Sequence, residues 1–156
     1  SKSYAMTGWR IGYAAGPKNI IAAIRKIQSQ STSNPSSISQ AAAVEALNGT
    51  QSFIKKRAKS FSDRRNFVVN YLNNIPGITC LMPKGAFYVF PKVDVPGMNS
   101  EDVAIELLKG GVLCSPGSAF GASGEGHLRF AYTISREDIS RGMDKTEAVL
   151  RRLRGE

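Results

Sequence analysis

The feature that most constrains the fold is a long amphipathic stretch in the middle of the chain. From Gln51 to Asn74, apolar residues recur at spacings of three and four, which is typical of a single helix with one buried face. Pro76-Gly77 ends this pattern, and the chain then changes to short alternating runs bounded by turn residues. The sequence therefore predicts one long helix that separates two regions of different character.

The region after this helix is predicted to form a small α/β unit. Its expected strands are residues 78–82, 86–90, 112–114 and 128–132, and the first two are expected to form a hairpin around residues 83–85. Asn99 is expected to cap a helix that ends at Gly110 and Gly111. Ser135, with Asp138 three residues later, is expected to begin a final helix.

The region before the long helix has a different pattern. Arg10–Ala15 is predicted to be a short strand, Asn19 is expected to cap a first helix with several isoleucines on one face, and a serine is expected to cap a second helix that Asn48-Gly49 ends. Residues 1–58 are therefore interpreted as the end of a larger domain. Residues 59–156 are interpreted as a small C-terminal α/β domain.

Composition indicates an ordinary globular protein, because no apolar run approaches the roughly 18 residues that a membrane span needs. The two cysteines, Cys80 and Cys114, lie in apolar settings and are expected to be reduced and at least partly buried, without a disulfide. We therefore expect a cytoplasmic protein that does not bind a membrane.

The net charge of +9 raises the hypothesis of nucleic-acid binding. The basic residues cluster, however, in segments with a helical pattern, such as Lys55-Lys56-Arg57 and Arg64-Arg65. No aromatic residues alternate with them as in a stacking platform for bases. A basic, solvated helix surface is the favoured interpretation, and no nucleic-acid partner is expected.

The chain opens with a run, Ser1 to Tyr13, that places a primary amine (Lys2) and a guanidinium (Arg10) eight residues apart. Two such residues are usually solvated charges, but bulky apolar neighbours such as Trp9 favour a buried Arg10, which would then need an anionic partner. An amine can condense with an aldehyde, and a guanidinium fork matches the oxygens of a phosphate. Pyridoxal phosphate presents both of these groups.

The order of residues in this run resembles the signature of class I, fold-type I aminotransferases of the prokaryotic aspartate/aromatic/prephenate subgroup. That signature is Ser-Lys, three variable residues, Met-Thr-Gly-Trp-Arg, one variable residue and Gly, and residues 1–12 meet every fixed position. The resemblance implies pyridoxal phosphate as cofactor, Lys2 as the catalytic lysine that carries it, and Arg10 as its phosphate ligand. It also implies an α/β fold with the end of the large cofactor domain, a long bridging helix and a small domain with a short sheet.

A second arginine, Arg129, is expected to bind an anion. In residues 128–132, alternation places the three bulky apolar residues on one face of a strand and leaves Arg129 beside the small Ala131 on the other. This run is similar to the Leu-Arg-Phe/Leu-Ser-Tyr element of the same family, whose arginine binds the substrate α-carboxylate. The alternative for Arg129 is an edge-strand arginine that reaches solvent.

Several other sequence features indicate little or nothing about function. Residues 85–88 (Gly-Ala-Phe-Tyr) resemble a family motif near the substrate entrance, and a turn with core aromatic residues explains them equally well. The glycine-rich run 121–126 precedes a strand, whereas a phosphate-binding turn should open a helix. His127 has no ligand pattern around it, and we expect no metal site.

The resemblance implies an aminotransferase that exchanges an amino group between an amino acid and a 2-oxo acid, and that forms a homodimer when intact. The chain lacks an initiator methionine and begins one residue before Lys2, so we expect a C-terminal portion with little transamination of its own. In enzymes of another subgroup of the family that are specialised for dicarboxylates, an arginine stands near the positions of Ser31 and Thr32. The resemblance therefore implies that this chain, which has none there, is not strictly specific for aspartate, and it leaves aromatic and prephenate-type substrates open. A non-enzymatic basic interaction module derived from an aminotransferase is the alternative.

Overall fold

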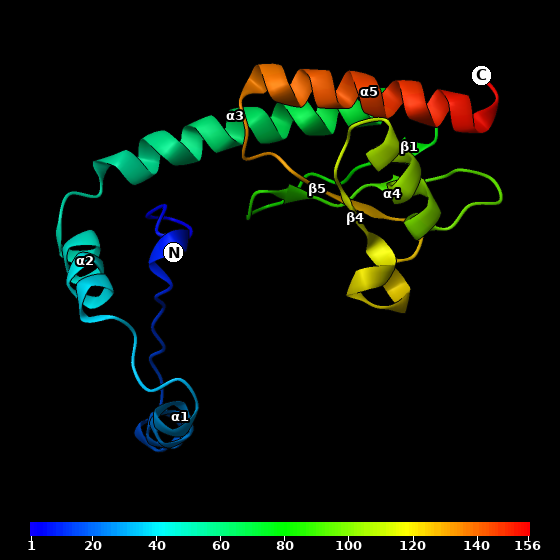
Figure 1. Cartoon of the computed structure of the whole chain (residues 1–156). Helices are drawn as coiled ribbons and strands as arrows, with labels where there is room; N and C mark the ends of the chain where they lie inside the picture. The colour runs from blue at the N-terminus through cyan, green and yellow to red at the C-terminus, as the bar shows by residue number, and fades with distance from the viewer. The chain divides into compact units, whose positions relative to one another are not determined.

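The structure is a computed structural model that describes all residues from 1 to 156 (Figure 1). The chain divides into two compact units, residues 1–57 and residues 58–156. The predicted long helix is confirmed as α3 (Ser52–Asn74), which begins in the first unit and continues into the second. The α/β fold class is confirmed as well, because the chain after α3 combines five short strands with two further α-helices.

The first unit contains a short 3₁₀-helix and two α-helices before α3. These elements are η1 (Thr7–Trp9), α1 (Lys18–Ser31) and α2 (Ser37–Asn48). The strand predicted at Arg10–Ala15 is wrong, because the first unit contains no strand at all. A strand is stable only when its backbone pairs with a neighbour, and no second extended segment pairs with this one.

The predicted helix caps of the first unit are only partly correct. α1 begins at Lys18, one residue before the predicted cap Asn19, and the carbonyl of Pro17 accepts the amides of Ile20 and Ile21, each at 3.0 Å. Ser36 precedes α2 as predicted, but its hydroxyl makes no capping hydrogen bond. α2 ends as predicted at Gly49, whose amide donates to the Glu45 carbonyl at 2.8 Å.

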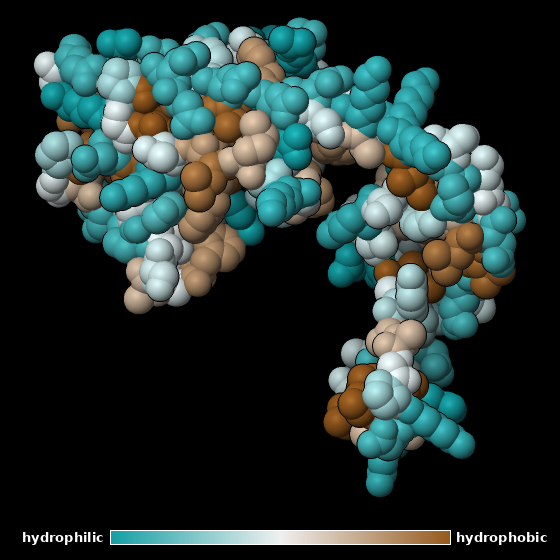
Figure 2. All heavy atoms as spheres, turned by 180° about the vertical axis from the view of Figure 1, so that it is seen from behind, coloured by the Kyte–Doolittle hydropathy of each residue, from teal (hydrophilic) through white to brown (hydrophobic).

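The first unit has very little buried surface. Met6 and Ser39 are its only buried residues, with exposed fractions of 8% and 6%. The isoleucines of α1 occur at the predicted spacing but remain largely exposed, with Ile27 at 71%. Figure 2 shows apolar side chains at the surface of this part of the chain.

The second unit combines short antiparallel strands with three helices. Its elements after α3 are β1 (Ile78–Thr79), β2 (Tyr88–Val89), β3 (Lys92–Val93), α4 (Ser100–Lys109), β4 (Ser115–Pro116), η2 (Gly117–Phe120), η3 (Ala122–Gly124), β5 (Leu128–Ala131) and α5 (Arg136–Arg154). β1 pairs with β3, and the other three strands form a sheet in the order β2-β5-β4.

The predicted hairpin between residues 78–82 and 86–90 is wrong. The first of these strands ends at Thr79, because the Asn73 side chain takes both backbone groups of Cys80: its Oδ1 accepts the Cys80 amide at 2.8 Å and its Nδ2 donates to the Cys80 carbonyl at 3.0 Å. The second strand, β2, pairs with β5 instead, with Val89 opposite Phe130. Strand partners are chosen by long-range packing, which local alternation does not reveal.

The strand predicted at residues 112–114 is also displaced. The amide of Val112 donates to the Leu107 carbonyl at 2.9 Å and so completes the end of α4, with Gly111 in the left-handed conformation (φ 83°). The strand β4 therefore begins only at Ser115, where it pairs with β5.

Both predicted caps of the second unit are confirmed. The Asn99 side chain accepts the amides of Glu101 and Asp102 at 3.0 and 2.9 Å, and the Ser135 hydroxyl accepts the amide of Asp138 at 3.1 Å. These bonds satisfy amides that the first turn of a helix leaves without partners.

The core of the second unit lies between its helices and strands. α3 and α5 run side by side in Figure 1, and the Tyr71 hydroxyl on α3 donates to Asp144 on α5 at 2.6 Å. Leu72, Leu107 and Leu150, from α3, α4 and α5, are completely buried and belong to one apolar cluster with residues of the strands.

Both cysteines lie in the second unit and are free, Cys80 buried and Cys114 half-buried, as the sequence predicts. Burial raises the pKa of each thiol to about 11. None of the helices combines the length and the apolar character needed to span a bilayer.

Candidate functional site

The segment that carries Lys2 and Arg10 folds into consecutive tight turns. The Ser1 hydroxyl donates to the Ile11 carbonyl at 2.7 Å, and the Met6 amide donates to the Ser1 carbonyl, also at 2.7 Å. Met6 is the one apolar residue of this segment that is buried. These contacts hold the beginning and the end of the sequence run together.

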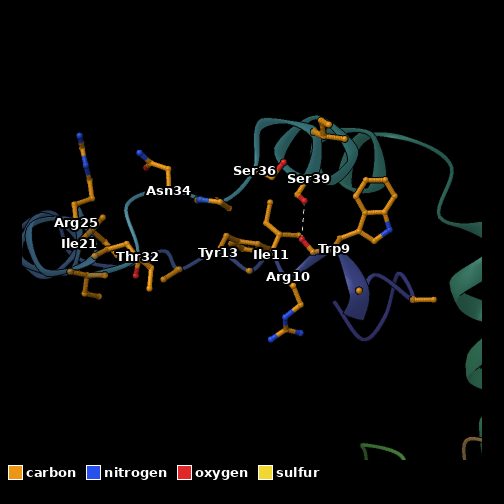
Figure 3. A pocket seen from close by; sticks show the side chains of 18 residues that line it. Trp9, Arg10, Ile11, Tyr13, Ile21, Arg25, Thr32, Asn34, Ser36 and Ser39 are labelled. Atoms are coloured by element: carbon orange, nitrogen blue, oxygen red, sulfur yellow. Dashed lines mark hydrogen bonds between the residues drawn. The ribbon is translucent and has the colours of Figure 1, made fainter. Parts of the chain in front are cut away.

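A buried serine anchors the segment to α2. The Ser39 hydroxyl donates to the Trp9 carbonyl at 2.8 Å, the bond drawn as a dashed line in Figure 3. Sequence reasoning missed Ser39, because a serine within a helix has no pattern that separates a buried anchor from an ordinary surface residue. The anchor fixes the backbone directly before Arg10.

Lys2 presents a free amine at the surface. Its side chain is exposed, and its ammonium group makes no hydrogen bond or ion pair within the structure. It lines a hollow of about 320 Å³ whose wall includes Ala43 and Leu47 of α2. The amine is therefore accessible to a small molecule.

Arg10 is exposed, so the prediction of a buried arginine is wrong. Its bulky neighbours Trp9 and Tyr13 are themselves 45% and 82% exposed and provide no apolar enclosure. The backbone of Arg10 is left-handed (φ 48°), and its Nη1 donates to the Thr7 carbonyl at 2.9 Å. In Figure 3 its side chain points away from Ser39.

Arg10 has no acidic partner, and its remaining donors are open. It lines a second, larger hollow of about 1460 Å³, together with residues of α1 and α2 such as Arg25 (Figure 3). Ile11, Gly12 and Tyr13 line both this hollow and the one beside Lys2. The structure thus brings the amine and the guanidinium into one folded segment, although they line different hollows.

The charge of the first unit suits a phosphate. Glu45 is its only acidic residue, against eight lysines and arginines, namely Lys2, Arg10, Lys18, Arg25, Lys26, Lys55, Lys56 and Arg57. A primary amine and an unpaired guanidinium in such a field are the groups that an aldehyde bearing a phosphate requires. The donor set of this unit therefore fits pyridoxal phosphate.

Arg129 lies in the middle strand of the three-stranded sheet of the second unit. The predicted alternation is confirmed: Leu128 and Phe130 are buried, Arg129 is half-buried and Ala131 is exposed. Ser115 stands directly opposite Arg129 on β4, and its hydroxyl accepts a hydrogen bond from Arg129 Nη2 at 3.1 Å. The guanidinium therefore lies on the exposed face of the sheet.

Two aromatic rings flank this guanidinium. Arg129 Cζ lies 4.5 Å from the ring centroid of Tyr88 and 4.6 Å from that of Phe120. None of the five ion pairs of the structure includes Arg129. Sequence reasoning missed Ser115 and Phe120, because Ser115 reaches Arg129 through the pairing of β4 with β5, and Phe120 reaches it through η2, which follows β4.

The glycine-rich run before β5 serves backbone packing. A Cβ on Gly117 would lie 1.9 Å from the Gly124 carbonyl oxygen, so the two backbones pass too closely for side chains. His127 stacks on Phe90 with 5.1 Å between ring centroids. No group of three or more His, Cys, Asp and Glu side chains is placed to hold a metal ion.

The three residues singled out by sequence fall in different units. Lys2 and Arg10 belong to the unit of residues 1–57, and Arg129 belongs to the unit of residues 58–156. Each unit presents cationic groups that no carboxylate of the chain neutralises.

Comparison with known proteins gives one consistent result. A family model described as aminotransferase class I and II matches residues 1–145. An aspartate aminotransferase of Rhizobium meliloti is 47% identical over 98% of this chain, and an aspartate/prephenate aminotransferase of Nitrosomonas europaea is 45% identical over 96% of it. The chain spans about 40% of the length of each of these relatives.

The fold agrees with this result. The crystal structure of an aromatic aminotransferase from Pyrococcus horikoshii superposes on 98% of this chain with a TM-score of 0.90 and 38% sequence identity, and the match covers 42% of that structure. The family model, the sequence identities and the superposition all support the same assignment. The chain belongs to the class I and II aminotransferase family.

Proposed function

We propose that this chain provides the cofactor lysine, the phosphate arginine and the carboxylate arginine of a pyridoxal-phosphate-dependent aminotransferase. The observation that carries the proposal is that Lys2, Arg10 and Arg129 are all free of acidic partners in a chain that belongs to this family. The burial cost concerns Arg129, because a half-buried arginine without a carboxylate is stabilised when an anion binds to it, whereas Lys2 and Arg10 are exposed and free to bind. The substrates are an amino acid and a 2-oxo acid.

Each proposed residue has a separate task. Pyridoxal phosphate, when bound, withdraws electrons from the Cα of an amino acid and so makes its proton acidic. Lys2 Nζ is the amine that holds the cofactor aldehyde and that, as a free base, accepts the Cα proton and returns it. Arg10 binds the phosphate with the donors that Thr7 leaves open.

Arg129 is proposed to bind the substrate α-carboxylate through the in-plane edge of its guanidinium that Ser115 leaves free. The names of the relatives include aspartate, prephenate and aromatic substrates, and we propose a substrate from this range rather than aspartate alone. We also propose that residues 1–58 complete a large cofactor domain, that residues 59–156 form the small domain, and that the whole enzyme is a cytoplasmic homodimer.

Site-specific labelling tests the proposal. The chain is mixed with pyridoxal phosphate, reduced with borohydride and digested, and the position of the added mass is mapped. Lys2 is expected to be labelled ahead of every other lysine, and Arg10→Ala is expected to raise the cofactor concentration for half-labelling by about tenfold or more, because a charged hydrogen bond is lost.

Lys18→Arg provides the matched control, because Lys18 is also an exposed lysine of the first unit. The Lys18→Arg substitution should leave the labelling of Lys2 unchanged, whereas Lys2→Arg should remove the main labelling site. Equal labelling of Lys2 and Lys18 in the unaltered chain would contradict the role proposed for Lys2.

A further inference from the structure

We propose that Tyr88 and Phe120 are positioning residues that clamp the Arg129 guanidinium and set its affinity for a carboxylate. This inference rests on the proposed function of Arg129. It adds two aromatic residues, from β2 and η2, to the single arginine that the sequence indicates.

The first step is geometric. The two rings lie 4.5 and 4.6 Å from Arg129 Cζ, within the range of a cation–π contact. Ring faces attract the cation but offer no hydrogen-bond acceptor. The guanidinium is therefore held without using the in-plane donors that recognise an anion.

The second step concerns charge. Arg151 on α5 shows the ordinary way to hold an arginine in this chain, because Glu147 and Glu156 pair with it at 2.9 and 3.4 Å. A carboxylate partner neutralises the guanidinium and occupies its donors. Arg129 has rings in place of a carboxylate, so it keeps both its positive charge and its open edge.

The third step concerns orientation. The sheet register places Tyr88 opposite Ala131, and Ser115 opposite Arg129, so Tyr88, Ser115, Arg129 and Ala131 share one face of the sheet. The Ser115 hydroxyl binds Nη2 at 3.1 Å and fixes the rotation of the guanidinium in its plane. Two rings and one hydroxyl together restrict the side chain to one pose, which lowers the entropy lost when a carboxylate binds.

The fourth step concerns the support of Phe120, which is 53% exposed. Phe90 contacts it edge to face, with ring centroids 5.9 Å apart and an angle of 87° between the rings. The close approach of Gly117 and Gly124 holds the 3₁₀ turn that carries Phe120. The clamp is therefore built into the fold and does not depend on burial of the ring itself.

Nuclear magnetic resonance of the whole ¹⁵N-labelled chain tests the clamp directly. The Nε–H signal of Arg129 is identified by its loss in Arg129→Lys. We expect ring currents to shift this signal upfield in the unaltered chain, Phe120→Leu to reduce the shift, and Phe120→Tyr to retain it. An unchanged shift in Phe120→Leu would overturn the inference, whether or not any ligand binds.

Titration with maleate, a dicarboxylate without an amino group, tests the consequence. Phe120→Leu is expected to raise the Kd for maleate by about two- to fivefold, as the loss of an exposed cation–π contact implies, while Tyr88→Phe and Phe120→Tyr bind as the unaltered chain does. An equal Kd in Phe120→Leu would overturn the inference. If the unaltered chain shows no saturable binding that Arg129→Lys abolishes, the carboxylate role in the proposed function fails, and the shifts still decide the clamp.

Discussion

The two units of this chain differ in how they hold their functional residues. Residues 58–156 enclose Leu72, Leu107 and Leu150 completely, and their candidate arginine rests on a sheet that this core supports. Residues 1–57 bury only Met6 and Ser39, and their candidate lysine and arginine depend on turns and one anchoring hydroxyl. Since apolar burial is the main driving force of folding, the second unit should be much the more stable of the two.

The chain contains separate probes for the two units. Trp9, its only tryptophan, lies in the first unit, and both cysteines lie in the second. Tryptophan fluorescence therefore reports the unfolding of the first unit, and the rate of thiol labelling reports the unfolding of the second. The comparison between them can be tested by paired substitutions.

The largest effect is expected from leucine truncation. Leu72→Ala removes a completely buried side chain and should lower the free energy of unfolding of the second unit by about 4 kcal/mol. Labelling of Cys80 is slow because the thiol is buried and its pKa is raised to about 11. The labelling rate should increase by about a thousandfold in Leu72→Ala, provided that the unfolded unit refolds faster than its thiol reacts. Leu47→Ala, at a site that is 48% exposed in the first unit, should leave this rate unchanged.

A glycine substitution should have the next largest effect. In Gly117→Ala the new Cβ would meet the Gly124 carbonyl oxygen at 1.9 Å, so the backbone must move, and we expect a loss of about 3 kcal/mol measured by urea denaturation with thiol labelling. Gly16→Ala in the first unit meets only Ile21 Cδ1 at 3.9 Å and should be neutral or slightly stabilising. Equal effects of the two substitutions would contradict the packing described for the glycine-rich run.

Helix caps sharpen the comparison at a smaller scale. Asn99→Ala removes an oxygen that accepts two amides and should cost about 1 kcal/mol, detected as faster hydrogen exchange in the first turn of α4. Ser36→Ala, at the same position before α2, removes a hydroxyl without a capping bond and should change exchange in α2 very little. A marked effect of Ser36→Ala would contradict the start of α2 described above, in which the Ser36 hydroxyl makes no capping bond.

Sequence patterns predicted the helices and caps of the second unit well, because Asn99 and Ser135 act through amides two or three residues away. They failed where the partner is distant. Nothing near Ile78 indicates that Asn73 will occupy the backbone of Cys80 and end the strand there. Local patterns report local bonds, and pairing between strands is decided by packing of the whole unit.

The candidate site shows the same division. Lys2, Arg10 and Arg129 are selected as candidate residues from sequence runs of thirteen residues or fewer. The exposure of Arg10 does not follow from such a run, because the side chains that would have to enclose it are not determined by its immediate neighbours. Phe120 and Ser115 reach Arg129 only through the fold, so the surroundings of the site required a structure even where its central residue did not.

The smallest expected effect concerns pH. The Glu125 carboxylate accepts the Ser100 amide at 2.6 Å and the Gly126 amide at 2.9 Å, and these bonds, together with the Ser100 hydroxyl, hold the pKa of Glu125 below its usual range. A carboxyl whose pKa is lower in the folded than in the unfolded state contributes stability above its unfolded pKa, and that contribution disappears as the pH falls through the folded pKa. The second unit should therefore become less stable on acidification below about pH 4.3, the ordinary value for glutamate.

Glu125→Gln should flatten this acid dependence, measured by urea denaturation followed by circular dichroism from pH 7 to pH 3. Glu45→Gln changes the net charge by the same amount in the first unit and provides the control. If both variants lost stability on acidification as steeply as the unaltered chain, the acid sensitivity would have to come from other carboxylates. Glu125 would then contribute to the start of α4 only as a neutral hydrogen-bond acceptor could, a role that glutamine would preserve.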